Sequence, residues 1–291
     1  MPKVVSTRRP QHQPKLGQHF LSDDSFAVQI VDGLGDVSQN TVLEIGPGRG
    51  VLTSLLAKRA RRLIAVELDR VLAAQLRLRF GMFSNVEVIE ADILSVDVDS
   101  LFGPKPGLRR PGIEFKPSPA KVIGNLPYYI TSDILLRLLD YSKYFETLVI
   151  LVQREVADRI SALPGSRDYG LLSATAQLYA RVEKLFTLPP AAFAPPPKVH
   201  STALRLTIAP RQQKLGLTEG YSNDAFIDFL KLSFGQKRKT LWNNLKSNYA
   251  DADLRGALAR ARVKPAVRAE TLTLEQSAAL FHALRNSRDG S

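Results

Sequence analysis

A short apolar run that stops at a glycine-rich turn and continues as a helix constrains this chain most. Residues 41–45 (TVLEI) are typical of a strand, residues 46–50 (GPGRG) of a tight turn, and residues 51–60 (VLTSLLAKRA) carry apolar side chains at helical spacing. Strands that alternate with helices are joined by right-handed crossovers. The unit therefore predicts an α/β fold, a mostly parallel Rossmann-like sheet with helices on both faces.

The same alternation recurs along the chain. Further strands are predicted at 62–67, 85–90, 120–125, 146–152, 181–188 and 199–208, and helices at about 69–80, 131–140 and 169–180. Beyond a boundary at about 208–215 the pattern is helical only, over 225–235, 238–246, 252–261 and 273–285. We expect a basic N-terminal arm, a sheet domain and a small all-helical C-terminal domain over residues 1–21, 22–210 and 211–291. Five prolines in residues 103–119 predict an exposed loop.

The excess positive charge lies at the two ends of the chain. The 291 residues include 40 Lys and Arg against 28 Asp and Glu, a net charge of +12. Residues 1–21 hold four basic and no acidic side chains, and residues 211–291 hold 14 and 8, whereas residues 22–210 hold 22 and 20. This distribution favours a polyanionic partner bound through the ends, although basic tails also serve solubility alone.

Composition excludes several classes of function. The chain has no cysteine, so disulfides, thiolate metal sites and cysteine nucleophiles are excluded. Its four histidines show no metal-binding spacing, and we expect no metal. Apolar runs such as 148–152 are far shorter than the roughly 20 residues of a membrane-spanning helix, and the N-terminus lacks the apolar core of a signal peptide. We therefore expect a cytoplasmic protein with no membrane partner.

Three successive predicted strands end in groups suited to a nucleoside. Gly46 opens the turn after the first strand, Glu67 ends the second, and Asp92 follows the third. Ligands of open α/β sheets bind at this edge, where Glu67 suits ribose hydroxyls and Asp92 an adenine amino group. The GxGxG spacing differs from the dinucleotide fingerprint GxGxxG, yet a nicotinamide or flavin cofactor stays open on these residues alone. Each acid could also be an ordinary solvated residue.

The fourth predicted strand ends in Asn125-Leu126-Pro127-Tyr128. Pro127 restricts Leu126 to extended geometry, so the Leu126 carbonyl can point out of the turn. That carbonyl, the Asn125 side chain and the Tyr128 ring suit an extruded base with an exocyclic amine. The alternative is a strand-to-helix turn with core tyrosines.

Together these motifs resemble the class I S-adenosylmethionine-dependent N6-adenine methyltransferases. The segments LGQHFL (16–21), FAPPPKV (193–199), FGQKRKT (234–240) and RAE (268–270) are similar to those of the ribosomal RNA adenine dimethyltransferases. The resemblance extends from about residue 15 to residue 285. Members of this family methylate two adjacent adenosines in the hairpin near the 3′ end of small-subunit rRNA.

The resemblance implies roles for individual residues. S-adenosyl-L-methionine would be contacted by His19, Leu21, Gly46, Glu67, Asp92 and Asn125. The target base would be received by Asn125, Leu126, Pro127 and Tyr128, with Phe193 stacking on its other face. The family usually has Asn where this chain has His19 and Tyr129.

A cationic cluster in the C-terminal part, Lys237, Arg238 and Lys239, is predicted to bind RNA phosphates. The expected partner is small-subunit rRNA within a small ribosomal subunit or its precursor, and we expect the chain to act as a monomer. An ordinary solvated helix end is the plainer interpretation of the cluster. Two other functions stay open: a large-subunit rRNA methylase that confers antibiotic resistance, and a non-catalytic RNA-binding assembly or transcription factor on the same fold.

Overall fold

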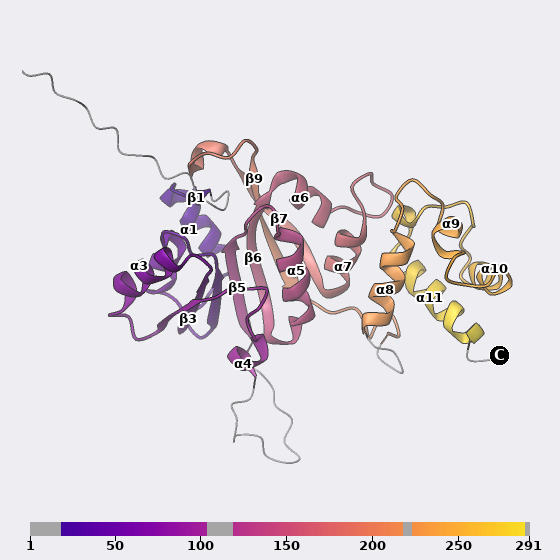
Figure 1. Cartoon of the computed structure of the whole chain (residues 1–291), viewed down its shortest axis with the longest axis horizontal. Coiled ribbons are helices and arrows are strands. Elements are labelled where there is room, and N and C mark those ends of the chain that lie inside the picture. Colours follow the sequence, from indigo (N-terminus) through magenta and orange to yellow (C-terminus); the bar gives the residue numbers. More distant parts are fainter. Residues whose placement is uncertain (1–18, 104–118, 218–222, 289–291) are drawn as a thin grey trace, which may run out of the picture.

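The chain forms one mixed seven-stranded sheet and a separate group of C-terminal helices (Figure 1). The computed structural model describes residues 19–103, 119–217 and 223–288. The strand order is β4-β3-β2-β5-β6-β9-β7, with β2 Thr41–Ile45, β3 Arg62–Glu67, β4 Val86–Glu90, β5 Ala120–Asn125, β6 Phe145–Gln153, β7 Ala180–Leu188 and β9 Ser201–Ile208. The strands β4 to β6 in this order are parallel, whereas β9 is antiparallel to β6 and to β7. The predicted α/β sheet is confirmed.

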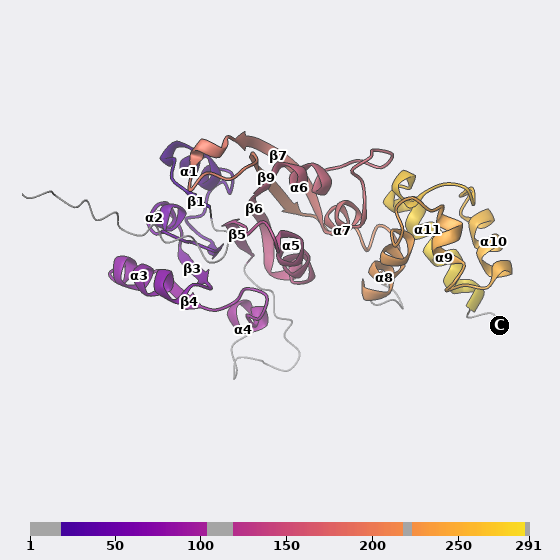
Figure 2. The same cartoon turned by 45° about the horizontal axis from the view of Figure 1, so that its top comes forward.

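Helices cover both faces of the sheet, as the apolar runs of the strands require (Figure 2). The helices of this part are α1 Asp24–Asp32, α2 Val51–Leu56, α3 Arg70–Phe80, α4 Val98–Phe102, α5 Thr131–Asp140, α6 Arg154–Ile160 and α7 Leu171–Tyr179. Successive strand residues point to opposite faces, so Val42 belongs to the hydrophobic cluster that includes α1 and α2, while Leu43 belongs to the cluster that includes α5 to α7. Among the described residues no helix is long and apolar enough to cross a membrane.

A two-stranded sheet that the sequence did not predict joins distant segments. β1 Phe20–Leu21 pairs antiparallel with β8 Phe193–Ala194. Beside it, the Ser22 N–H donates to the Ala192 carbonyl at 2.9 Å. The segment that enters the sheet domain is thereby fixed next to the proline-rich segment before β9.

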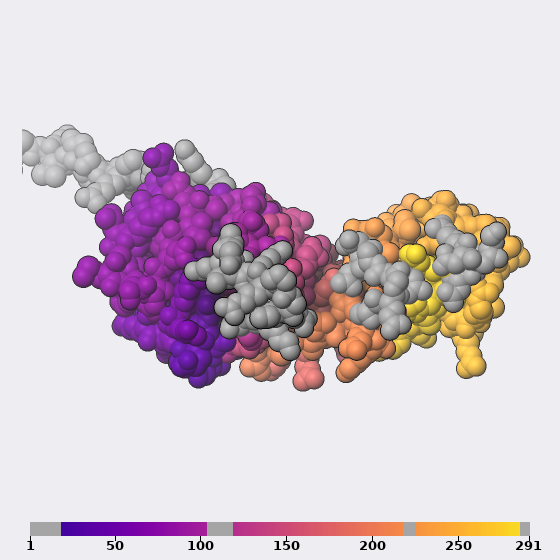
Figure 3. Space-filling model, turned by 90° about the horizontal axis from the view of Figure 1, so that it is seen from below, coloured from indigo at the N-terminus to yellow at the C-terminus, as the bar shows by residue number. Residues whose placement is uncertain are grey.

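The last helices form a second lobe, joined to the first by a narrower waist (Figure 3). They are α8 Asn223–Ser233, α9 Leu241–Leu245, α10 Asp251–Arg260 and α11 Leu274–Arg288. Leucines such as Leu241, Leu254 and Leu280 are fully buried among them. At the waist the Tyr169 ring meets the Phe234 ring edge-on at 6.0 Å between centroids.

The helix predicted over 238–246 is wrong at its start. α9 begins only at Leu241, because Thr240 is extended and its side chain accepts from the Asn243 N–H at 3.3 Å as an N-cap. The cationic cluster therefore lies in the turn before α9. Most of the predicted basic arm and of the proline-rich loop, residues 1–18 and 104–118, lies outside the described residues.

Candidate functional site

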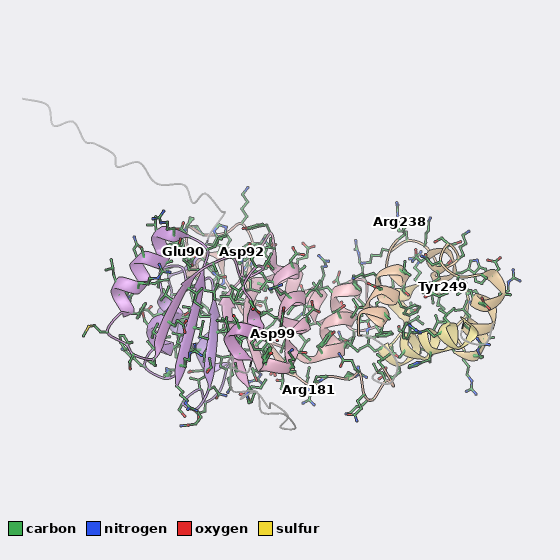
Figure 4. All side chains as sticks on the ribbon, turned by 60° about the horizontal axis from the view of Figure 1, so that its bottom comes forward. Glu90, Asp92, Asp99, Arg181, Arg238 and Tyr249 are labelled. Atoms are coloured by element: carbon green, nitrogen blue, oxygen red, sulfur yellow. The ribbon has the colours of Figure 1, made fainter. Side chains whose placement is uncertain are left out.

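A pocket lies at the carboxyl ends of the parallel strands β2, β3, β4 and β5. The space inside its rim amounts to about 810 Å³, part of which is open solvent at its mouth. The predicted residues that line it are His19, Gly46, Glu67, Asp92, Asn125, Leu126, Pro127 and Tyr128. The structure thus brings together the nucleoside-binding groups and the Asn-Leu-Pro-Tyr turn. Figure 4 labels Asp92 at this edge, close to Glu90 at the end of β4.

The glycine turn between β2 and α2 lets the backbone approach the pocket. Gly46, Gly48 and Gly50 have φ of 63°, 56° and 77°, left-handed values that favour glycine. A Cβ at Gly48 would lie 2.8 Å from the Phe20 ring. The turn therefore requires glycine for its left-handed backbone, and at Gly48 also because the Phe20 ring occupies the space of a side chain.

Glu67 stabilises this turn through a hydrogen bond, and its carboxylate can still accept further ones. One carboxylate oxygen accepts from the Gly48 N–H at 3.0 Å, and the other from the Asp69 N–H at 2.9 Å. The side chain is 3% exposed, and burial raises its pKa above the ordinary value. A carboxylate has about four lone-pair sites, so each oxygen still has one for a ribose hydroxyl. The residue therefore fits the nucleoside part of S-adenosylmethionine.

Asp92 lies just beyond β4 and is half-buried. Its Oδ1 accepts from the Leu94 N–H at 2.9 Å, which orders the turn after the strand. Oδ2 makes none of the hydrogen bonds seen in the described part of the chain, so it is available to an amino donor. This free acceptor fits the amino group of an adenine ring.

The turn after β5 presents two acceptors to the pocket. The Asn125 Nδ2 donates to the His19 carbonyl at 2.8 Å, so its Oδ1 is the end left to accept. The Leu126 N–H donates to the Leu151 carbonyl at 3.0 Å, and no hydrogen bond within the described ranges ends on the Leu126 carbonyl oxygen. The Pro127 carbonyl instead accepts from the Thr131 hydroxyl at 3.0 Å. This arrangement is the one that binding of an exocyclic amine requires.

Tyr128 lies beside these acceptors with its ring fixed. Its hydroxyl lies 2.6 Å from the Ser201 Oγ at the start of β9. Burial raises the pKa of Tyr128 above its ordinary value, so the phenol stays protonated at neutral pH. It can therefore offer an aromatic face but no general base.

Two predicted residues lie behind the pocket wall. Leu21 and Phe193 are paired in register between β1 and β8 and are buried, at 6% and 3% exposure. Neither lines the pocket. Two residues that the sequence analysis left without a role, Phe20 and Tyr129, do line it, and Tyr129 is 62% exposed. Their only signal in the sequence is that each directly follows a predicted site residue.

The predicted RNA-binding cluster lies on the other lobe, where Figure 4 shows Arg238 well away from Asp92. Arg238 and Lys239 are exposed and have no ion pair within residues 223–288 or the other described ranges. Lys237 differs, because its ammonium donates to the Arg167 carbonyl at 2.6 Å across the waist. The three cations are thus not equivalent.

Glu44 is a buried acid beneath the glycine turn. It is 1% exposed, and neither carboxylate oxygen has a hydrogen-bond partner in the described part of the chain. Burial raises its pKa from 4.5 to about 8, although the neighbouring Thr53 offsets part of the rise. Glu44 therefore carries a proton at neutral pH.

Replacing Glu44 by Gln should flatten the pH dependence of stability. The unfolded chain releases the Glu44 proton near pH 4.5 and the folded chain only near pH 8. The wild type should therefore lose stability relative to Glu44→Gln as the pH rises through this window, by a few kcal/mol. Urea unfolding of both proteins at pH 5 and pH 8.5 measures the difference. Parallel curves across the window would show that Glu44 is already ionised in the folded protein.

Comparison with known proteins gives one consistent family. The family model for ribosomal RNA adenine dimethylase matches residues 9–286. A protein of Koribacter versatilis named Ribosomal RNA small subunit methyltransferase A is 55% identical over 98% of this chain and 99% of its own length. A protein of the same name from Acidobacterium capsulatum is 52% identical over 98% of this chain and 95% of its own.

Solved structures agree on the fold. A dimethyladenosine transferase from Plasmodium falciparum superposes with a TM-score of 0.71 at 23% identity, over 94% of this chain and 98% of its own. The 23S rRNA methyltransferase ErmE superposes with a TM-score of 0.63 at 26% identity, over 91% and 99%. The match of almost the whole chain to the family model excludes the nicotinamide and flavin interpretations. The chain belongs to the ribosomal RNA adenine dimethylases, a family of S-adenosylmethionine-dependent enzymes.

Proposed function

We propose that this chain transfers methyl groups from S-adenosyl-L-methionine to N6 of two adjacent adenosines in the hairpin near the 3′ end of small-subunit rRNA. One observation carries the proposal: the strand-end acids and the Asn125-Leu126 acceptors line the same pocket. The choice of small-subunit rRNA is supported by the names of the relatives that are 55% and 52% identical. The chain's monomeric state and cytoplasmic location stay predictions from the sequence.

In this proposal one end of the pocket holds the cofactor. Glu67 would accept from the ribose hydroxyls and Asp92 from the adenine amine, while Gly46 and the segment that contains His19 and Leu21 would complete the site. When bound, S-adenosylmethionine supplies a methyl group on a positively charged sulfur. The glycine turn would let the main chain approach it without side-chain obstruction.

The other end would receive the target adenine. The lone pair of its N6 is delocalised into the ring, so the amine is a poor nucleophile. The Asn125 Oδ1 and the Leu126 carbonyl would accept its two N–H bonds and favour a tetrahedral nitrogen, whose lone pair then faces the methyl carbon. In that geometry the N–C bond would form as the C–S bond of the cofactor breaks, and the resulting ammonium would lose a proton to water. Positioning and electrostatics would thus supply the catalysis, with no strong base.

Aromatic stacking would hold the target base in its end of the pocket. Tyr128 offers an aromatic face within the pocket. Phe193 is buried behind the wall, so a stacking role for it requires the segment around β8 to shift when RNA binds. Base–aromatic stacking contributes about 1–3 kcal/mol per base in complexes of this kind.

A methylation assay on isolated subunits tests the proposed function. The chain is incubated with labelled S-adenosylmethionine and with small or large subunits purified from cells that lack the methylation. We expect label in the small-subunit rRNA only. Label in the large subunit would instead support the large-subunit alternative, and measurable cofactor binding without label in either would support a non-catalytic RNA-binding factor.

Contacts from the cationic cluster to phosphates should appear in the salt dependence of binding. If Arg238 neutralises one phosphate, Arg238→Ala should reduce the slope of log K against log salt by about 0.7 to 0.9. Arg181→Ala, an exposed cation that lies apart from Arg238 in Figure 4, is the matched control. The two slopes are measured by filter binding of small subunits between about 50 and 200 mM salt, the range in which phosphate contacts dominate. Equal slopes for the two variants would remove Arg238 from the RNA interface.

A further inference from the structure

Residue 19 contacts two segments that are far from it in the sequence, the turn after β5 and the segment that contains Pro195. Its main-chain carbonyl accepts from the Asn125 Nδ2 at 2.8 Å. Its imidazole Nδ1 lies 2.8 Å from the Pro195 carbonyl oxygen. The same ring stacks on Tyr128, with 5.7 Å between centroids and 29° between planes.

The chemistry of these contacts fixes their direction. A carbonyl oxygen only accepts, so Nδ1 carries the proton and donates to Pro195. For the same reason the amide nitrogen of Asn125 faces residue 19, and its Oδ1 faces away. Main chain and side chain of one residue therefore orient both the acceptor and the aromatic ring of the Asn-Leu-Pro-Tyr turn.

The segment around residue 19 is anchored firmly enough to do this. Phe20 and Leu21 pair with Ala194 and Phe193. The next residue, Ser22, donates its N–H to the Ala192 carbonyl at 2.9 Å and its hydroxyl to the same oxygen at 3.2 Å. His19 therefore directly precedes a strand that is paired, which limits the movement of its imidazole.

Tyr128 is restrained from two sides. Its hydroxyl meets the buried Ser201, and one face of its ring is covered by the imidazole. A ring held at its tip and on one face has few orientations left. Only its other face is then available for a base to stack on.

We propose that His19 is a positioning residue for methyl transfer. Its imidazole holds the Tyr128 ring and its main-chain carbonyl holds the Asn125 side chain, in the geometry that receives the target adenine. This inference rests on the proposed function. The Asn that the family usually has at this position can donate to Pro195 but has no ring to place on Tyr128, so this chain uses a side chain with both capacities. This positioning role is additional to the cofactor contact that the proposed function gives to the same segment, so it should appear in the transfer rate even when the cofactor is saturating.

The test separates the two contacts of the ring. His19→Ala removes both, His19→Phe keeps a ring without the donor, and His19→Asn keeps a donor without the ring. We measure single-turnover methyl transfer by the full chain at saturating small subunits, and cofactor affinity by titration calorimetry. At saturating cofactor, His19→Ala should transfer methyl groups about tenfold more slowly than the wild type, since a lost hydrogen bond and a lost stack together correspond to about one order of magnitude in rate. His19→Phe and His19→Asn should each recover part of the loss.

Ser22→Ala is the matched control, because it removes a side-chain contact from the same segment without touching Tyr128 or Asn125. It should transfer methyl groups at the wild-type rate. If Ser22→Ala slowed methyl transfer as much as His19→Ala does, the slower rate would come from a general loosening of the segment, and the proposal would be overturned. A loss of cofactor affinity in His19→Ala with a wild-type rate at saturating cofactor would confine the ring to the cofactor site and overturn the proposal. Faster transfer would mean that the imidazole occupies the place of the base and would overturn it as well. Failure of the wild type to methylate small subunits would instead refute the proposed function itself.

Discussion

Asn125→Ala is expected to lower methyl transfer to small-subunit rRNA by at least about a hundredfold, while the protein stays folded. The change removes the Oδ1 acceptor that the amine requires, and it also releases the His19 carbonyl from its 2.8 Å hydrogen bond. Loss of one preorganised hydrogen-bonding group at a reacting centre lowers the rate about a hundredfold to a thousandfold in well-studied enzymes. Single-turnover transfer from labelled cofactor to small subunits measures the rate.

Asn40→Ala is the control for loss of an asparagine as such. The Asn40 Nδ2 donates to the Pro119 carbonyl and to Glu146, each at 3.2 Å, just before β2 and at the end of the sheet away from the pocket. It should lose a little stability and keep its transfer rate. A wild-type rate in Asn125→Ala would remove the residue from the reaction and with it the proposed role of the turn.

Glu67→Gln should weaken cofactor binding about tenfold to a hundredfold. Each oxygen of Glu67 accepts from one main-chain N–H, so an amide would turn its NH₂ group toward either Gly48 or Asp69. An N–H left unpaired in a buried site costs about 1–3 kcal/mol, and about 1.4 kcal/mol corresponds to tenfold in affinity. The glycine turn would then open where the ribose is proposed to bind. Titration calorimetry with S-adenosylmethionine measures the dissociation constant.

Glu90→Gln provides the comparison. Glu90 lies directly opposite Glu67 in the register of β3 and β4, but it is exposed, and its ion pair among the described residues is with Arg77, at 3.3 Å. A surface ion pair contributes little, so this variant should bind the cofactor as the wild type does. If both variants weakened binding alike, the acid at the end of β3 would have no special role.

The sequence was most informative about the parallel strands. Runs such as 41–45 and 120–125 are apolar on both faces and end in glycine or proline turns, so their bounds were predicted to the residue. Three helices, α1, α4 and α6, are absent from the prediction. With five and seven residues, α4 and α6 are too short to show a periodic apolar stripe. The signal for α1 is present in the sequence, since Ala27, Ile30 and Val31 are buried at helical spacing after the N-cap Asp23. Helical spacing alone does not give the start of α9, because the capping role of Thr240 depends on its extended backbone.

The candidate site was predictable where strand order alone brings residues together. Carboxyl ends of parallel strands meet at one edge, so Gly46, Glu67, Asp92 and Asn125 had to be neighbours. The pairing of β1 with β8 joins residues more than 170 positions apart, and no local sequence pattern predicts it. It buries Leu21 and Phe193 and gives His19 its contacts, which is why the sequence alone could not define the role of that ring.

Mass spectrometry of the rRNA after reaction in vitro tests the central claim most directly. Small and large subunits that lack the methylation are treated with the chain and S-adenosylmethionine, and their rRNA is digested and mapped. We predict that two neighbouring adenosines near the 3′ end of the small-subunit rRNA each gain two methyl groups on N6, and that Asn125→Ala adds none. Methyl groups on large-subunit rRNA, on ribose or on another base would contradict the account.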